Sequence, residues 1–320
     1  MVKRFSHLGQ VHIGLYGAVM GLAGLGLAAR AAAPLFPGVF RAPAYFTELW
    51  VALGVVALLI LLALYLYKIG KDWKGVKADF SDPALLGFTG ALPVGMTLVA
   101  GGLGPYAPAV ASKLWWLGCL MLTAFQVCGI ARWLAGQVAL EKLNAGWLIL
   151  IVGGIVVPGP GIALGHAEAS RFFFGFSACA AIALLPLLLA RAALAAPLAE
   201  ALRPTWFILL VPPSLIYANG VALYPATLFL ENLYFCALVA GLALLVFARG
   251  FWRWPFGPAW WAFTFPLVAL AQAATRYAQE HPGGPWKTLA AIAFALATLV
   301  VAMVLVRTLL GARHLFSKRL

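Results

Sequence analysis

Long apolar runs separated by short charged or Pro/Gly-rich breaks dominate the chain. A helix that crosses the bilayer needs about 20 apolar residues and satisfies its own backbone hydrogen bonds there. The pattern predicts ten such helices, at residues 9–29, 47–67, 84–103, 110–131, 145–165, 170–190, 204–223, 226–247, 258–277 and 285–309. We therefore expect an all-α membrane protein that forms a single transmembrane domain over residues 1–320.

Helix-bending residues are unevenly distributed over the ten runs. The odd-numbered runs carry glycine or proline near their middles, whereas the even-numbered runs are mostly smooth, with Pro186 as the exception. The bending residues are Gly14, Gly17, Gly21, Gly24, Pro93, Gly153, Gly154, Pro212, Pro213 and Pro266. From Pro93 onward they recur at intervals of roughly sixty residues, which favours repeated helical hairpins. The prediction is ten transmembrane helices as five hairpins around a central pore, with odd helices inner and even helices outer.

The central pore follows from the chemistry of a bent membrane helix. Backbone groups freed by proline are tolerated in a membrane only where protein or a water-filled cavity satisfies them. Polar side chains also share faces with the bends, and the predicted pore-lining residues are Gly21, Thr89, Pro93, Thr97, Gly153, Gly154, Pro212, Ile216, Asn219, Trp261, Val268, Gln272 and Thr275. The alternative is that the glycines are packing contacts and that each threonine bonds its own helix.

Charge and composition place the protein in a lipid bilayer. Charged residues make up only 10% of the chain, and the net charge is +13. This composition excludes a nucleic-acid-binding surface and favours basic loops beside anionic lipid. Alternate loops hold 16 and 6 of the Lys and Arg residues, with the larger number on the side of the termini. Both termini are thus predicted to be cytoplasmic.

Few residues in the predicted spans can perform chemistry. No Asp, Glu, Lys or Arg lies at the centre of a span, and the five histidines lie at span ends or in loops. The four cysteines fall inside apolar runs without CxxC spacing, so we expect them to be small core residues. No enzyme, metal site or cofactor is predicted. A pore without fixed charge in a basic protein should favour anions.

Four segments carry a resemblance to a known family. They are WWAFTFP at 260–266, LRPTWFILLVPPS at 202–214, FTGALPVGMTL at 88–98 and GLYGAVMGL at 14–22. Because these segments occur in this order and at this spacing, the chain resembles the tellurite-resistance/dicarboxylate transporter (TehA-type) family. That family includes the plant guard-cell slow anion channels. The resemblance implies a homotrimer with one pore in each subunit. It also implies a pore gate formed by Phe265, with Gly17 as the close-packed glycine beside it.

The expected function is a gated, passive anion channel of the cytoplasmic membrane. Small monovalent anions such as chloride or nitrate are the expected substrates. The first alternative is a carrier for dicarboxylates or other organic anions, or a tellurite-related transporter. A carrier should have a substrate-binding Arg or Lys within its spans, and the sequence shows none there. A non-transporting membrane scaffold or receptor is the second alternative, and it would not need bent helices around a polar path.

Overall fold

The computed structural model describes residues 11–40, 45–136 and 140–317, and within them every regular element is a helix. Eight stretches are long and apolar enough to cross a membrane: Ile13–Ala32, Tyr45–Lys71, Pro83–Leu103, Pro108–Leu134, Ala167–Leu194, Glu200–Leu223, Leu228–Phe247 and Trp286–Gly311. The protein is therefore an all-α membrane protein, as the apolar runs predict.

Five of these stretches are single helices. They are α3 (Tyr45–Lys71), α7 (Pro108–Leu134), α10 (Ala167–Leu194), α12 (Leu228–Phe247) and α14 (Trp286–Ser317). Each exposes large aliphatic side chains, for example Leu59, Leu120, Ile182, Val239 and Leu299. Only 22–33% of their most apolar windows is buried inside the protein. We call them the outer helices, because a surface of this kind is stable against lipid and unstable in water.

The other three stretches are mostly buried and change helix type along their length. They are η3 (Ile13–Tyr16) with α1 (Gly17–Ala32), α5 (Pro83–Leu86) with η4 (Gly87–Gly90) and α6 (Ala91–Leu103), and η7 (Glu200–Leu210) with α11 (Val211–Leu223). Between 72% and 83% of their windows is buried. A 3₁₀ segment inside a longer helix is a frequent mark of strain or of a functional hinge.

The two remaining predicted spans are not among the eight stretches, the first because its helix is broken and the second because it is continuous but less apolar. The first consists of α8 (Gly146–Ile151), η6 (Gly153–Ile155) and α9 (Pro158–Ala163). The glycine pair and the two prolines of this segment disfavour a continuous helix. The second consists of η9 (Pro258–Phe263) and α13 (Thr264–Glu280), in which Pro266 follows the change from 3₁₀ to α-helix. Together with the three buried stretches, these two segments form the inner layer.

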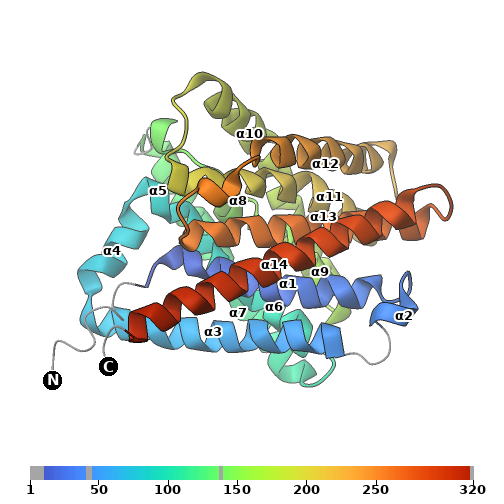
Figure 1. Ribbon diagram of the computed structural model, residues 1–320, viewed down its shortest axis with the longest axis horizontal. Coiled ribbons are helices and arrows are strands. Elements are labelled where there is room, and N and C mark those ends of the chain that lie inside the picture. The colour runs from blue at the N-terminus through green and yellow to red at the C-terminus, as the bar shows by residue number, and fades with distance from the viewer. Residues whose placement is uncertain (1–10, 41–44, 137–139, 318–320) are drawn as a thin grey trace.

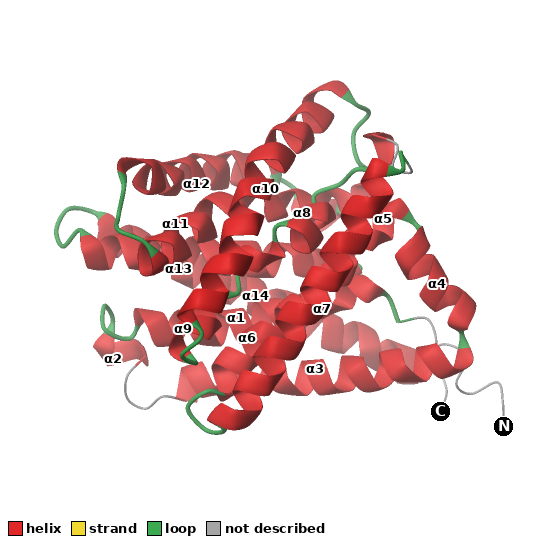
Figure 2. Ribbon diagram, turned by 180° about the vertical axis from the view of Figure 1, so that it is seen from behind, coloured by secondary structure: helices red, strands yellow, loops and turns green. Residues whose placement is uncertain are grey.

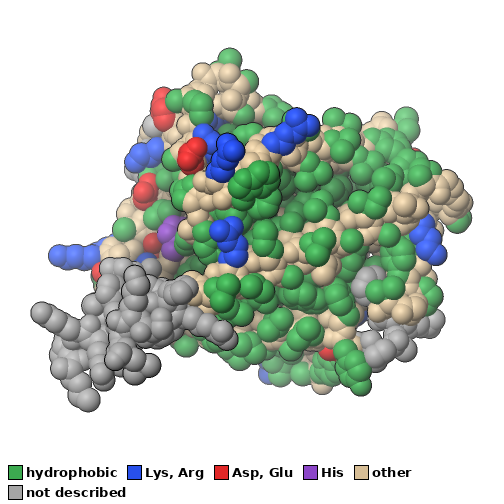
Figure 3. Space-filling model, in the orientation of Figure 1, with side chains coloured by type: hydrophobic (Ala, Val, Ile, Leu, Met, Phe, Trp, Pro, Cys, Tyr) green, Lys and Arg blue, Asp and Glu red, His purple; other side chains and the backbone are tan. Residues whose placement is uncertain are grey.

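The outer helices cover the inner layer from several sides. In Figure 1, α14 crosses in front of α1 and α13 and contacts both, and α3 lies below α1, which it contacts. Seen from behind in Figure 2, α7 and α10 cover α6, α8 and α9. The surface in Figure 3 is mostly hydrophobic, and its charged side chains lie mainly toward the end of the molecule that carries α4 (Trp73–Ser81).

Small residues let inner and outer helices approach closely. A Cβ added to Gly54 of α3 would lie 2.8 Å from the backbone nitrogen of Ala23 in α1. One added to Gly26 of α1 would lie 2.9 Å from the backbone nitrogen of Val51. In a membrane, where lipid is as apolar as leucine, such close backbone contact is a main source of helix association.

The expectation that all four cysteines are core residues is wrong. Cys119 is buried, but Cys128, Cys179 and Cys236 are exposed on α7, α10 and α12. All four thiols are free. The sequence misleads here because an apolar run predicts a membrane helix without predicting which of its faces contacts lipid.

Candidate functional site

Two cavities lie within the inner layer, and they meet at Phe265. The first has a volume of about 240 Å³ and is lined in part by His12, so we call it the His12 cavity. The second has a volume of about 260 Å³ and is lined in part by Arg30, so we call it the Arg30 cavity. Phe265 and Val156 line both. Phe265 is 6% exposed, and its aromatic ring is the largest side chain shared by the two cavities.

A row of glycines on α1 brings the helix against the segment that carries Phe265. A Cβ added to Gly17 would lie 3.2 Å from the Cβ of Trp261, and one added to Gly21 would overlap Thr264. One added to Gly24 would lie 3.0 Å from Cδ2 of Phe265. These glycines are four and three residues apart, so they share one face of the helix. The ring of Phe265 thus rests on α1 backbone.

The backbone beside Phe265 is arranged to tolerate proline. Pro266 lacks the amide that would bond the carbonyl of Ala262 in a regular α-helix. At this point η9 ends and α13 begins, and the Thr264 hydroxyl donates to the carbonyl oxygen of Trp261 at 2.7 Å. The change from 3₁₀ to α-helix therefore places Phe265 next to the irregular turn.

The His12 cavity is apolar apart from one side chain. Its lining comes from all five inner segments and includes Phe88, Ile149, Ile208 and Phe256, and among the described residues His12 is the only titratable one that lines it. The His12 Nδ1 accepts a hydrogen bond from the backbone nitrogen of Gly14 at 3.0 Å and so caps η3. Ions pass such an apolar constriction only after it is wetted.

The Arg30 cavity is more polar. Arg30, Asn219 and Gln272 line it, and no acidic residue of the described chain does. The Asn219 Nδ2 donates to the carbonyl oxygen of Ile155 at 2.7 Å. That carbonyl lies just before Pro158, where the broken fifth segment leaves it without an α-helical partner. The Asn219 side chain therefore connects α11 to η6, where the fifth segment is interrupted.

Seven of the sequence-predicted site residues line a cavity. Gly17, Gly153, Pro212 and Trp261 line the His12 cavity, Asn219 and Gln272 line the Arg30 cavity, and Phe265 lines both. The other predicted pore residues line neither of these two cavities: Gly21, Thr89, Pro93, Thr97, Gly154, Ile216, Val268 and Thr275.

Local contacts explain why several of these residues line neither cavity. The hydroxyls of Thr89 and Thr97 donate to carbonyl oxygens of their own helix, at 2.7 and 2.8 Å. The backbone nitrogen of Gly154 donates to Oγ of Ser177 on the outer helix α10. An inner helix has neighbours on every side, so a shared face identifies a packing surface as readily as a pore surface.

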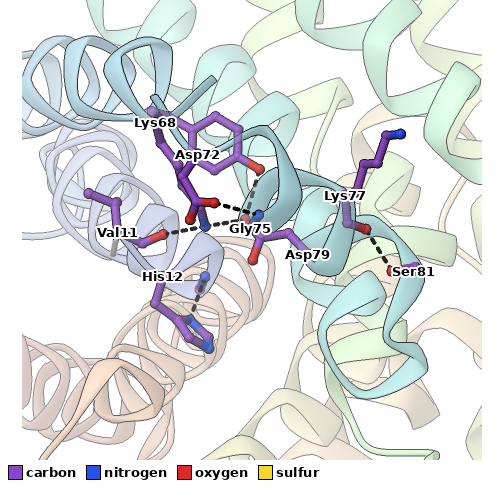
Figure 4. A network of polar contacts seen from close by, with 10 residues as sticks. Val11, His12, Lys68, Asp72, Gly75, Lys77, Asp79 and Ser81 are labelled. Atoms are coloured by element: carbon purple, nitrogen blue, oxygen red, sulfur yellow. Dashed lines mark hydrogen bonds and ion pairs between the residues drawn. The ribbon is translucent and has the colours of Figure 1, made fainter. Parts of the chain in front are cut away.

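Sequence reasoning missed a buried ion pair near the His12 cavity. Lys68 is one of the 16 basic residues that charge counting assigns to loops on the side of the termini. Its ammonium lies 2.7 Å from Oδ2 of Asp79, and the two side chains are 6% and 7% exposed. The Tyr65 hydroxyl donates to the same oxygen at 2.9 Å, and the Lys68 ammonium donates to the carbonyl oxygen of Val11 at 3.0 Å. Figure 4 shows Lys68 bridging the segment that carries His12 to α4. We call Lys68, Asp79, Tyr65 and Val11 the Lys68 clamp.

A pH dependence is expected from His12, which lies just before the first membrane-spanning stretch. Burial lowers the pKa of His12 below its ordinary value of 6.5, and the nearby Lys68 charge acts in the same direction while Asp79 opposes it. As the pH falls below 6.5, His12 is therefore protonated in the unfolded chain while it is still neutral in the folded protein. Part of the stability present above pH 6.5 should then be lost between that pH and the lower folded pKa.

The measurement is thermal unfolding of the detergent-solubilised protein at pH 5 and pH 7.5. His12→Asn keeps a capping acceptor and removes the titration, so it should lose less stability on acidification than the parent does. His281→Asn, at the C-terminal end of α13, is the control and should behave like the parent. An equal pH dependence in parent and His12→Asn would contradict the assignment.

Comparison with known proteins finds relatives that are described as anion channels or as a tellurite resistance protein. The S-type anion channels SLAH2 and SLAH3 of Arabidopsis thaliana are 27% and 25% identical to the chain, over 82% and 99% of its length. The chain spans about half the length of these plant relatives, at 52% and 51%. A tellurite resistance protein TehA homolog of Haemophilus influenzae is 23% identical, over 92% of the chain and 89% of that relative.

The family profile covers nearly the whole chain. The profile described as voltage-dependent anion channel matches residues 10–309, which include every inner segment and both cavities. The family relationship expected from the four sequence segments is thereby confirmed. The chain belongs to the voltage-dependent anion channel family.

Proposed function

We propose that the protein is a gated, passive channel for small monovalent anions such as chloride and nitrate, with Phe265 closing the path between its two cavities. The observation that carries the proposal is the position of one buried aromatic ring on the boundary of both cavities. An aromatic ring blocks an ion path without burying a charge, and a small displacement of the helix that carries it is enough to move it.

The proposed architecture is that of five helical hairpins, with odd spans lining the path and even spans facing lipid. The division into buried and lipid-exposed helices supports it. We further propose a homotrimer in the cytoplasmic membrane, with a pore in each subunit and both termini in the cytoplasm. The distribution of 16 against 6 basic residues between alternate loops supports that orientation.

Selectivity is expected to follow the cost of dehydration. The His12 cavity offers an anion few hydrogen-bond donors in exchange for water. Weakly hydrated nitrate and iodide should therefore permeate at least as well as chloride. Reversal potentials of reconstituted protein in mixed anion solutions measure this order. A clear preference for chloride over nitrate, or any cation selectivity, would contradict an apolar gate region.

A carrier for dicarboxylates or other organic anions is the second candidate, and Arg30 is the observation that favours it. A guanidinium that lines a cavity is a common ligand for carboxylates. Flux in proteoliposomes separates the two functions. A channel carries anions only down their electrochemical gradient, whereas accumulation of succinate against its gradient after a pH step would identify a coupled carrier.

A further inference from the structure

The Arg30 cavity contains hydrogen-bond donors that bond to no described residue of the chain. Gln272 is half-buried and makes no hydrogen bond with the described part of the chain. Arg30 donates from Nη1 to the Gly101 carbonyl oxygen at 3.1 Å, and from Nη2 to Glu48 at 3.2 Å and to the Gly102 carbonyl oxygen at 3.4 Å. A guanidinium has five N–H donors, so Nε–H and one Nη1–H remain without a partner in the described residues.

The charge around the cavity is also asymmetric. Arg30 lines the cavity, but its ion-pair partner Glu48 does not. The two side chains are 30% and 34% exposed, so solvent weakens their attraction. An anion in the cavity competes with Glu48 for the same guanidinium, and no carboxylate in the lining repels it.

We propose that the Arg30 cavity is a binding site for a small monovalent anion, held by Arg30 and Gln272 on one side of Phe265, with Glu48 as a counter-charge that keeps binding weak. The site rests on the proposed channel function and assigns the residues that select and release the ion. Conduction requires binding strong enough to attract the ion and weak enough to release it. Arg30 supplies the attraction and Glu48 limits it.

The cavity has room for such an ion. Its volume of about 260 Å³ exceeds the roughly 30 Å³ that one water molecule occupies in the liquid. A partly hydrated chloride or nitrate therefore fits with several waters beside it. On its other sides the cavity is lined by small and apolar residues, among them Gly24, Leu98 and Leu215.

Binding is tested directly on detergent-solubilised protein, without any need for flux. Thermal stability is titrated with nitrate at constant ionic strength, using gluconate as the balancing anion, because a ligand that binds only the folded state stabilises it. Arg30→Gln should raise the half-effective nitrate concentration about tenfold, as expected for loss of a charged hydrogen bond. Gln272→Leu should raise it by a smaller factor.

Gln272→Leu and one further variant make the test independent of damage to the fold. Because Arg30 also holds the Gly101 and Gly102 carbonyls, Gln272→Leu provides a variant in which these bonds are intact. Arg276→Gln is the matched control, since Arg276 pairs with Glu280 at 2.7 Å near the same end of the inner layer and lines neither cavity. It should leave the nitrate titration unchanged. Equal half-effective concentrations in all three variants would overturn the proposal.

Flux measurements test the role of Glu48 in a Phe265→Ala background. Glu48→Gln should lower the half-saturating nitrate concentration several-fold and reduce the maximal flux, because release becomes slower. A higher half-saturating concentration would contradict the role of Glu48. Loss of nitrate binding in Arg30→Gln together with absent flux in every variant would leave the site standing and refute the channel function instead.

Discussion

Phe265→Ala is expected to raise anion conductance about tenfold or more, because it removes the ring that separates the His12 and Arg30 cavities. Both cavities already reach this side chain. If Phe265 is the gate, truncation to alanine should join the two cavities and let an anion pass without movement of the backbone. Electrical recording from planar bilayers with nitrate on both sides measures the effect, normalised to the amount of folded protein.

The competing interpretation is that Phe265 only packs between helices. Truncating a buried phenylalanine leaves a cavity that costs about 3 to 5 kcal/mol, so a purely packing role predicts less folded protein and no gain in conductance. Phe263→Ala is the matched control. Phe263 lies two residues away, is 4% exposed, lines neither cavity and packs against Phe207 and Trp254.

The two variants should therefore separate the roles. Phe263→Ala should lose stability without gaining conductance, whereas Phe265→Ala should gain conductance. Gly17→Val should act in the opposite direction to Phe265→Ala, because its side chain would crowd Trp261 beside the proposed gate. A well-folded Phe265→Ala protein with unchanged conductance would remove Phe265 as the gate.

The second large effect is expected at the Lys68 clamp. Asp79→Leu should lower the free energy of unfolding by about 3 to 5 kcal/mol, because it leaves the buried Lys68 ammonium without its counter-charge. Lys68→Met should have a comparable effect through the unpaired carboxylate. The midpoint and slope of denaturant unfolding in detergent provide the measurement.

The double variant shows whether the charge pair itself is the cause. Lys68→Met with Asp79→Leu removes both charges, and replacing a whole buried pair by apolar residues is often neutral. It should therefore recover most of the lost stability. Glu48→Gln at the half-exposed Arg30 pair is the control and should cost less than about 1 kcal/mol. A double variant as unstable as the sum of the single ones would show that the charges act independently.

The sequence alone was sufficient for the class of protein and for the locations of its bends. Apolar run length predicts membrane helices because the bilayer imposes it, and proline and glycine act on the backbone within one turn of themselves. The changes of helix type at Gly17, Ala91, Val211 and Thr264 accordingly lie within or near the predicted bent runs. The motif around Phe265 likewise identified the residue that the structure places between two cavities.

Only the tertiary structure decided which polar groups face a cavity and which charges are buried. Periodicity puts Thr97 and Gln272 on defined helix faces, but neighbouring helices determine that Gln272 lines a cavity and that Thr97 does not. Lys68 meets the carbonyl oxygen of Val11, and Arg30 meets the end of α6, through contacts between distant segments. Charge counting treats such residues as loop residues, because hydropathy depends on neighbours in sequence whereas burial depends on neighbours in space.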